Sequence, residues 1–184
     1  MEIVGKGMDM FAVDDYVVNG SLGVCQIADI VNERGLNGEA IDYYILRPAF
    51  YTHNSVMMVK TPVNNPKVEL RKIVTPEEAA ALIASMPEQE TIWIDNPDER
   101  YRQFRCYIKS GEPDKLVQVI KTIYLARQEK AASGKNLTRT DDEVMKTAEK
   151  QLNEEFALAL DIAPEAVAPY IQSHLGADVS GHIG

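Results

Sequence analysis

The first part of the chain, from about residue 11 to residue 70, alternates apolar and polar residues in short runs. A period of two is typical of half-buried β-strands, and breaks rich in asparagine, glycine and proline separate the runs. The segment Arg34–Gly38 contains two glycines and has the chemistry of a tight turn. The predicted strands are Tyr16–Val18, Leu22–Val31, Ile41–Leu46, Ser55–Lys60 and Val68–Leu70. Several short strands at this spacing predict a small antiparallel barrel.

From residue 75 onward, the apolar residues recur at helical spacing. Thr75-Pro76-Glu77-Glu78 has the pattern of a capping box with proline at the first helical position, and Thr140-Asp141-Asp142-Glu143 has the pattern of a second. The predicted helices run from the Thr75 cap to about Ser85, from Asp98 to Ser110, from Asp114 to about Ala132, from the Thr140 cap to about Ala159, and from Pro164 to about His174.

The change of period predicts a two-domain protein, β followed by α. Residues 10–74 have the size of a Tudor- or SH3-like antiparallel barrel, and residues 75–172 are predicted to form an all-α helical bundle. Residues 173–184 are predicted to be a disordered tail. The first ten residues contain three methionines and are predicted to be a leader ahead of the first strand.

Composition places the chain among soluble globular proteins, with 45% apolar and 26% charged residues. No run approaches the roughly 20 apolar residues that a membrane span requires, so we expect no membrane partner. Cys25 and Cys106 lie far apart and without metal-binding spacing. This usage predicts reduced thiols in a cytoplasmic protein.

The net charge of −9 is unevenly distributed along the chain. Residues 98–139 contain ten Lys and Arg against five Asp and Glu, whereas the segments on either side are acidic. Because binding to phosphates needs local positive potential, this basic island permits a directed contact with an anionic surface. Basic side chains on helices are also common as ordinary solvated charges, and the pattern alone leaves both interpretations open.

No arrangement of residues in the sequence is typical of catalysis. His53, His174 and His182 have neither metal-binding nor triad spacing. The carboxylates cluster on helix faces and in helix caps, where solvation and the helix dipole explain them. We therefore predict a binding protein that is not an enzyme, with no metal, no cofactor and no small-molecule substrate.

Trp93 is the only tryptophan and lies in a polar, proline-punctuated segment between two differently patterned halves of the chain. A large aromatic side chain in such a segment needs a partner. Trp93 either packs the two halves together, as its neighbours Ile92 and Ile94 would allow, or is presented outward to a protein or nucleic acid.

Short motifs recur in order along nearly the whole chain. They are Tyr16-Val17-Val18 with Gly20 and Gly23-Val24, Asp42–Leu46, Met57–Asn65, Val68–Arg71, Val74–Glu78, Ile108–Gly111, Leu116–Tyr124, Gly134–Leu137 and Ala148–Leu160. Taken together they resemble the CarD/CdnL family of bacterial transcription regulators that bind RNA polymerase, in its Firmicutes-type branch. The N-terminal half is also similar to the polymerase-interacting domain of transcription-repair coupling factor.

The resemblance implies that the N-terminal domain binds the β subunit of RNA polymerase. Arg34 and Lys60 match the family's basic contact positions. Lys60 stands where some members have arginine, which keeps the charge but loses the planar fork of hydrogen-bond donors.

The resemblance also implies that the helical domain contacts promoter DNA at the upstream edge of the bubble and modulates the open complex. In the family a tryptophan wedges into the minor groove there. The alignment places Pro97 at that position and Trp93 four residues earlier. The predicted DNA-binding residues are Trp93, Arg100, Arg102, Lys109, Lys135 and Arg139. The alternative function is that of an adaptor on RNA polymerase without productive DNA contact.

Overall fold

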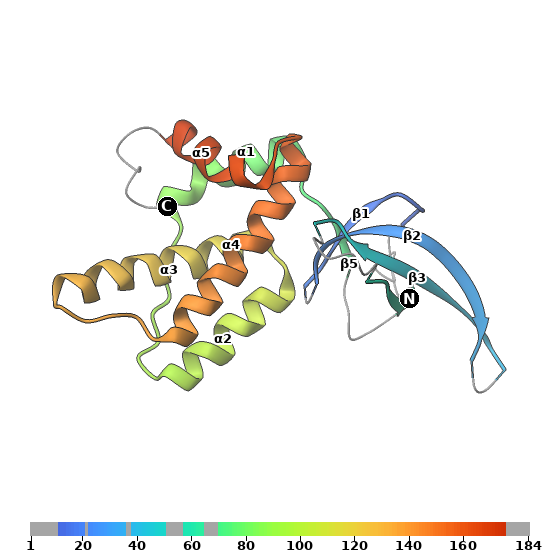
Figure 1. Cartoon of the computed structure of the whole chain (residues 1–184), viewed down its shortest axis with the longest axis horizontal. Coiled ribbons are helices and arrows are strands. Elements are labelled where there is room, and N and C mark those ends of the chain that lie inside the picture. The colour runs from blue at the N-terminus through green and yellow to red at the C-terminus, as the bar shows by residue number, and fades with distance from the viewer. Residues whose placement is uncertain (1–10, 21, 36–37, 51–56, 65–69, 176–184) are drawn as a thin grey trace, which may run out of the picture.

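The structure, a computed structural model, describes residues 11–20, 22–35, 38–50, 57–64 and 70–175 (Figure 1). The predicted leader at residues 1–10 lies outside the described residues. The tail predicted from residue 173 is described only as far as Leu175. No helix in these ranges is long and apolar enough to cross a membrane.

The N-terminal half is an antiparallel sheet of five strands in the order β4-β3-β2-β1-β5. The strands are β1 (Tyr16–Asn19), β2 (Gly23–Arg34), β3 (Ala40–Pro48), β4 (Val59–Pro62) and β5 (Leu70–Lys72). Strands β2 and β3 form a long hairpin that extends away from the rest of the molecule (Figure 1). The β part of the fold prediction is thus confirmed, with β4 and β5 as the outer strands among the described residues.

The sheet has one buried face because side chains alternate along each strand. Val17, Cys25, Ile27, Tyr44 and Leu46 share this face and are at most 2% exposed. A bulge between Ile27 and Asp29 shifts the register of β2 against β3. The bulge keeps both Ile27 and Tyr44 in the core while β2 continues outward to the hairpin tip.

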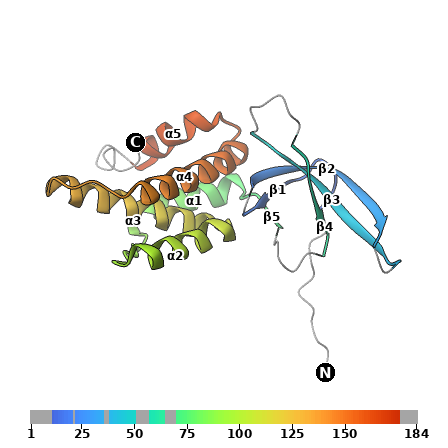
Figure 2. The ribbon, with the colours of Figure 1, turned by 60° about the horizontal axis from the view of Figure 1, so that its bottom comes forward.

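The C-terminal half consists of helices, which confirms the α part of the prediction. They are α1 (Pro76–Ser85), the 3-10 turn η1 (Met86–Glu88), α2 (Pro97–Ser110), α3 (Pro113–Ala132), α4 (Arg139–Leu160) and α5 (Pro164–Leu175). Helix α4 packs against each of the other four α-helices. Figure 2 shows that the helices and the sheet occupy opposite halves of the molecule.

Local sequence explains where most helices begin and end. Thr75 and Glu78 form the predicted capping box of α1. Helix α2 begins after Asn96, whose side chain accepts hydrogen bonds from two backbone N–H groups, and ends at Gly111, which has a φ of 66°. The predicted cap of α4 is wrong by two residues: Thr138, not Thr140, caps the helix and accepts from the Asp141 N–H at 3.1 Å.

The strand boundaries differ more from the prediction. Strand β2 continues to Arg34 because it pairs with β3 out to Ala40. Strand β4 begins at Val59 and ends at Pro62, later than the predicted Ser55–Lys60, and residues 51–56 and 65–69 lie outside the described ranges. Pairing with β3 determines where β2 and β4 begin and end. Short sequence runs with weak alternation give little local indication of that pairing.

The two halves meet where the sheet contacts the C-terminal end of α2 and the middle of α4. Gly20, after β1, packs against the backbone of Lys109 and accepts a hydrogen bond from Gln151 Nε2 at 3.2 Å. Arg71 on β5 reaches both Gly111 and the buried carboxylate of Glu155. This interface holds the hairpin and the far end of the helical half at opposite ends of the molecule (Figure 1).

Candidate functional site

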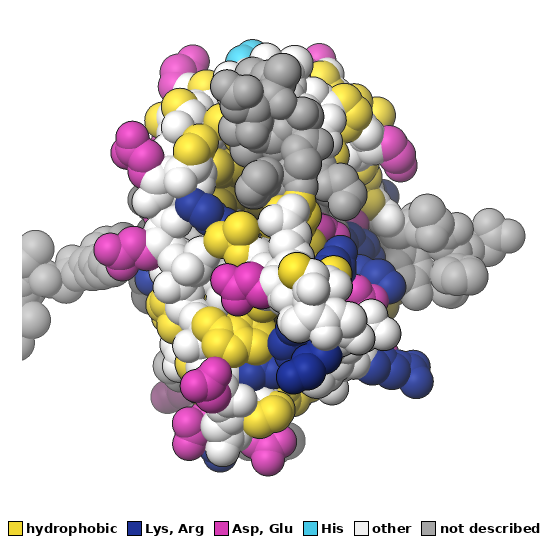
Figure 3. Space-filling model, turned by 90° about the vertical axis from the view of Figure 1, so that its left-hand side faces the viewer, with side chains coloured by type: hydrophobic (Ala, Val, Ile, Leu, Met, Phe, Trp, Pro, Cys, Tyr) yellow, Lys and Arg dark blue, Asp and Glu magenta, His cyan; other side chains and the backbone are white. Residues whose placement is uncertain are grey.

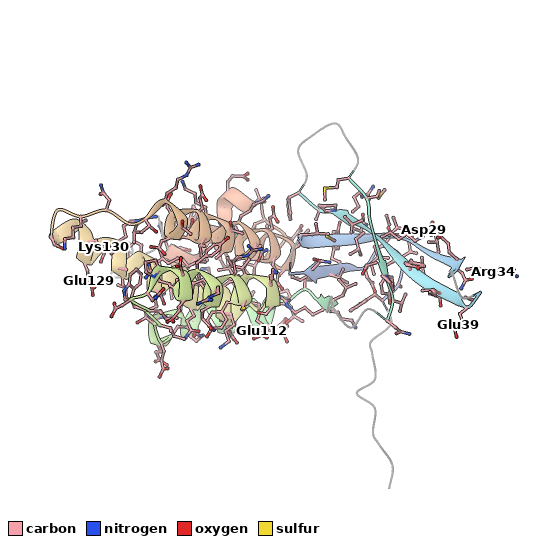
Figure 4. The ribbon with its side chains drawn as sticks, turned by 90° about the horizontal axis from the view of Figure 1, so that it is seen from below. Asp29, Arg34, Glu39, Glu112, Glu129 and Lys130 are labelled. Carbon is pink, nitrogen blue, oxygen red and sulfur yellow. The ribbon has the colours of Figure 1, made fainter. Side chains whose placement is uncertain are left out.

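Trp93 lies at the end of the helical half that is distant from the sheet. Trp93 is 37% exposed, and two cations lie over its ring: the Arg100 guanidinium is 4.1 Å from the ring centroid and Lys130 Nζ is 5.3 Å away. Figure 4 labels Lys130 at one end of the molecule and Arg34 at the other. The interpretation of Trp93 as a packing anchor between the two halves is therefore wrong, because its contacts lie within the helical half.

The segment that carries Trp93 is held along α3 by polar contacts. Lys121 Nζ donates to the carbonyl oxygens of Pro87 and Gln89, both at 2.7 Å. The Ile92 N–H donates to Thr122 Oγ1 at 3.0 Å. A segment with its backbone groups satisfied in this way has little conformational freedom left to lose, so Trp93 is presented in a defined orientation before any ligand binds.

Arg100 is a structural residue. Its side chain is 2% exposed and forms a bidentate pair with Asp141, with Nε–Oδ1 and Nη2–Oδ2 distances of 2.9 Å, while Nη1 donates to the carbonyl oxygen of Ile94. Burial alone would raise the pKa of Asp141, but hydrogen bonds from Arg100 and Thr138 and the Arg100 charge outweigh it and lower that pKa. Arg100 thus holds the Trp93 segment to α4.

The prediction that Arg100 contacts the DNA backbone does not fit this placement, because its donors face protein acceptors and its charge is neutralised. Lys130 lies beside Trp93 as well as Arg100, and its ammonium group is the second cation over the ring. In the sequence, the local pattern of α3 does not distinguish Lys130 from the other lysines of that helix.

The remaining predicted DNA-binding residues are exposed but scattered. Arg102 and Lys109 lie on α2, and Lys135 lies in the connection between α3 and α4. Arg139 is 92% exposed and pairs with Glu143 one turn further along α4, with an Nε–Oε1 distance of 2.8 Å. Figure 3 views the molecule from the end of the helical half that is distant from the sheet, and it shows Lys and Arg side chains gathered beside an apolar patch.

At the opposite end, Lys60 and Arg34 lie near the β2–β3 hairpin. Lys60 pairs with Glu33 and lies over the ring of Tyr43, 4.2 Å from its centroid. Arg34 is exposed at the end of β2 and leaves the strand on the face opposite to Glu33. Lys60, on β4, therefore lies beside the hairpin that carries Arg34, but the two side chains are on opposite faces of the sheet.

The face that carries Lys60 also carries a strip of apolar side chains, which we call the hairpin strip. It consists of Val31, Ile41, Tyr43 and Ile45, which are each only partly buried. A partly exposed apolar strip flanked by Glu33 and Lys60 is the composition expected of a protein contact. In the sequence, these four residues show only the alternation of an ordinary strand, which does not indicate a contact surface.

A groove between α2 and α4 also contains titratable groups. Its lining includes Tyr101, Arg105, Asp141 and Glu143. Asp141 is held by Arg100, and Glu143 pairs with Arg139, so the two carboxylates serve the structure of the helix ends. His53 and His182 lie outside the described residues, and His174 stacks on Tyr170 with ring centroids 4.0 Å apart.

The described part of the chain is a small antiparallel sheet joined to a helical domain, with a distinct surface at each of its two ends. Residues 11–74 match the CarD-like/TRCF RID domain, and residues 81–172 match the C-terminal domain of CarD. The chain belongs to the CarD family of transcription regulators, whose members interact with RNA polymerase. A comparison with curated proteins finds no match.

Proposed function

We propose that this protein binds the β subunit of bacterial RNA polymerase through its sheet domain, and that its helical domain contacts promoter DNA at the upstream edge of the transcription bubble. It would thereby modulate the stability of the open complex, acting in the cytoplasm. The observation that carries the proposal is the partly exposed Trp93, with two cations over its ring, at the end of the molecule opposite the hairpin.

The polymerase contact is supported by the hairpin. The hairpin strip offers apolar area. Lys60 adds positive charge on the same face of the sheet, and Arg34 adds positive charge on the opposite face. In interfaces, buried apolar and aromatic groups supply most of the affinity, and charges at the rim steer association and set specificity. Tyr43, beneath Lys60, is the aromatic group best placed to act as an anchor.

The DNA contact is supported by the surface around Trp93. Minor-groove proteins hold kinked DNA by inserting apolar side chains between base steps, while basic groups bind the phosphates beside them. Trp93 offers a preorganised ring, and Lys130, Lys135 and Arg102 supply positive charge on the helical domain. With Arg100 neutralised by Asp141, these three lysine and arginine side chains are our candidates for phosphate contacts.

A second candidate function is an adaptor on RNA polymerase without productive DNA contact. The burial of Arg100 and the pairing of Arg139 with Glu143 favour it, because both leave less positive charge near Trp93 than the sequence indicates. Acidic Asp95, Asp98 and Glu99, all exposed, lie in the same region.

A gel shift on a fork-junction promoter, with and without polymerase, separates the two functions. The regulator should change open-complex lifetime in the presence of polymerase, and Trp93→Ala should abolish most of that effect. If Trp93→Ala retains the full effect, the ring is not a wedge. An adaptor would be retained by polymerase without any change in the lifetime of the open complex.

Polymerase pull-down tests the other half of the proposal. Charge reversal at both Arg34 and Lys60 should abolish retention of the protein. The matched control is Lys72→Glu, which reverses an exposed lysine on β5, at the other edge of the sheet. Binding that survives the double reversal would exclude the hairpin as the polymerase contact.

A further inference from the structure

The interface between the sheet and the helices is organised around one arginine. Arg71 on β5 forms a bidentate pair with Glu155 on α4, with an Nη2–Oε2 distance of 2.7 Å. Its Nε also donates to the carbonyl oxygen of Gly111, at the C-terminal end of α2, at 3.1 Å. One side chain therefore joins the sheet to two different helices.

Glu155 completes this centre, which we call the Arg71 hub: Arg71, Glu155, Gly111 and Val74. The Glu155 side chain is 1% exposed, and its Oε1 accepts from the Val74 N–H, in the segment between β5 and α1, at 3.0 Å. A buried carboxylate is stable only when its charge is compensated, so the position of Glu155 on α4 dictates where Arg71 and the start of the helical half must lie.

A second contact beside the hub makes the interface stiff. Gly20 is buried against α2 so closely that a Cβ there would overlap the carbonyl oxygen of Lys109. At Gly111 an added Cβ would lie 3.0 Å from Val18 Cγ1, on β1. Two glycines, one from each half, thus allow the backbones to approach, and the polar hub and the close packing restrict rotation about different points.

We propose that Arg71 and Glu155 are positioning residues that fix the angle between the sheet domain and the helical domain, so that polymerase binding at the hairpin delivers Trp93 to one place on the promoter. This inference rests on the proposed function. Its physical basis is effective concentration: two sites on one rigid body bind a matching pair of targets far more tightly than two sites joined by a loose hinge.

Loosening the hub should change one binding affinity and leave another unchanged. Loosening the hub leaves both contact surfaces intact, since the hub residues belong to neither the hairpin strip nor the surface around Trp93. Affinity for polymerase alone should remain unchanged, whereas affinity for the polymerase–promoter complex should fall about tenfold, because the second contact no longer benefits from a fixed geometry.

Two variants with different chemistry loosen the interface. Glu155→Gln removes the charge that holds Arg71 while keeping the shape of the side chain. Gly20→Ala removes no charge and instead forces the turn after β1 away from α2. The matched control is Lys72→Gln, which removes a neighbouring positive charge on the same strand from an exposed side chain. Circular dichroism and thermal melting establish that each variant is folded.

The angle between the domains can be measured on the protein by fluorescence energy transfer. Cys106 on α2 is exposed and accepts one dye, whereas Cys25 is buried in the sheet core. A Glu39→Cys substitution near the hairpin tip provides the second position (Figure 4). The parent protein and Lys72→Gln should give one narrow distribution of transfer efficiencies, and Glu155→Gln and Gly20→Ala should each give a broader or shifted one.

Binding to polymerase and to the polymerase–promoter complex is then measured with unlabelled protein. Unchanged transfer distributions in both loosened variants would overturn the role of the hub, whatever the binding data. Altered distributions with full affinity for the polymerase–promoter complex would overturn the positioning role. A parent protein that binds the promoter complex no better than polymerase alone would overturn the proposed function, and the transfer distributions would still report whether the hub fixes the angle.

Discussion

Replacing Arg100 with alanine should destabilise the helical domain and release the Trp93 segment. The substitution leaves Asp141, which is 3% exposed, without its ion-pair partner; among the described residues, Thr138 remains as a side-chain donor. It also removes the hydrogen bond to the carbonyl oxygen of Ile94 and the cation above the Trp93 ring.

The magnitude follows from the burial of both partners. Removing one side of a buried, hydrogen-bonded ion pair costs about 3–5 kcal/mol, because the other charge remains desolvated. For a chain of this size, a change of that order lowers the melting temperature by roughly 6–20 °C. Arg102→Ala is the matched control: it removes an exposed arginine from the same helix and should change stability by less than about 0.5 kcal/mol.

Chemical denaturation followed by Trp93 fluorescence measures both effects, since this tryptophan is the only one in the chain. The native emission of Arg100→Ala should shift to longer wavelength as the ring becomes more hydrated, and the unfolding midpoint should fall. Equal midpoints for Arg100→Ala and Arg102→Ala would refute the reasoning, because they would show that the Arg100–Asp141 pair is not buried in solution.

Three further predictions concern caps, thiols and acid stability. Thr138→Ala should lower the free energy of unfolding by about 1 kcal/mol through loss of the α4 cap, and Thr140→Ala should not, as denaturant titration of both variants can show. A thiol reagent should modify Cys106 rapidly in the native protein and Cys25 only on unfolding, because burial raises the pKa of Cys25 to about 12. Because the pKa of Asp141 lies below its ordinary value in the folded protein, its stabilising contribution is complete above pH 3.8 and is lost as the pH falls through the lower folded pKa. Acid titration of stability should show this loss in the parent protein and not in Asp141→Asn.

The predicted helices agree with the structure closely where local chemistry determines their ends. Thr75 and Glu78 cap α1 as expected, and Gly111 ends α2 because glycine adopts a positive φ without strain. The cap of α4 was misplaced because Thr138 and Thr140 each have an acidic residue three positions later, Asp141 and Glu143 respectively. Only the direction of the chain before the helix decides which threonine oxygen meets the free N–H groups.

The candidate site was less predictable, because charge in a sequence does not reveal its partner. Arg100 looked like the other basic residues of its helix, yet Asp141, 41 residues away, buries and neutralises it. Lys130 looked equally ordinary and yet lies over Trp93. Whether a basic residue is a free charge or part of the interior depends on long-range packing, on which periodicity carries no information.

By itself, the sequence determined the two-domain order, most of the helices, the family resemblance and the presence of a single tryptophan in a polar segment ahead of the second predicted helix, because these depend on residue type and local spacing. Only the tertiary structure decided where Trp93 lies, which cations flank it, and how Arg71 and Glu155 join the domains. The physical reason is that local spacing specifies the elements, whereas the pairing of buried charges and the close approach at Gly20 arise only when distant elements pack together.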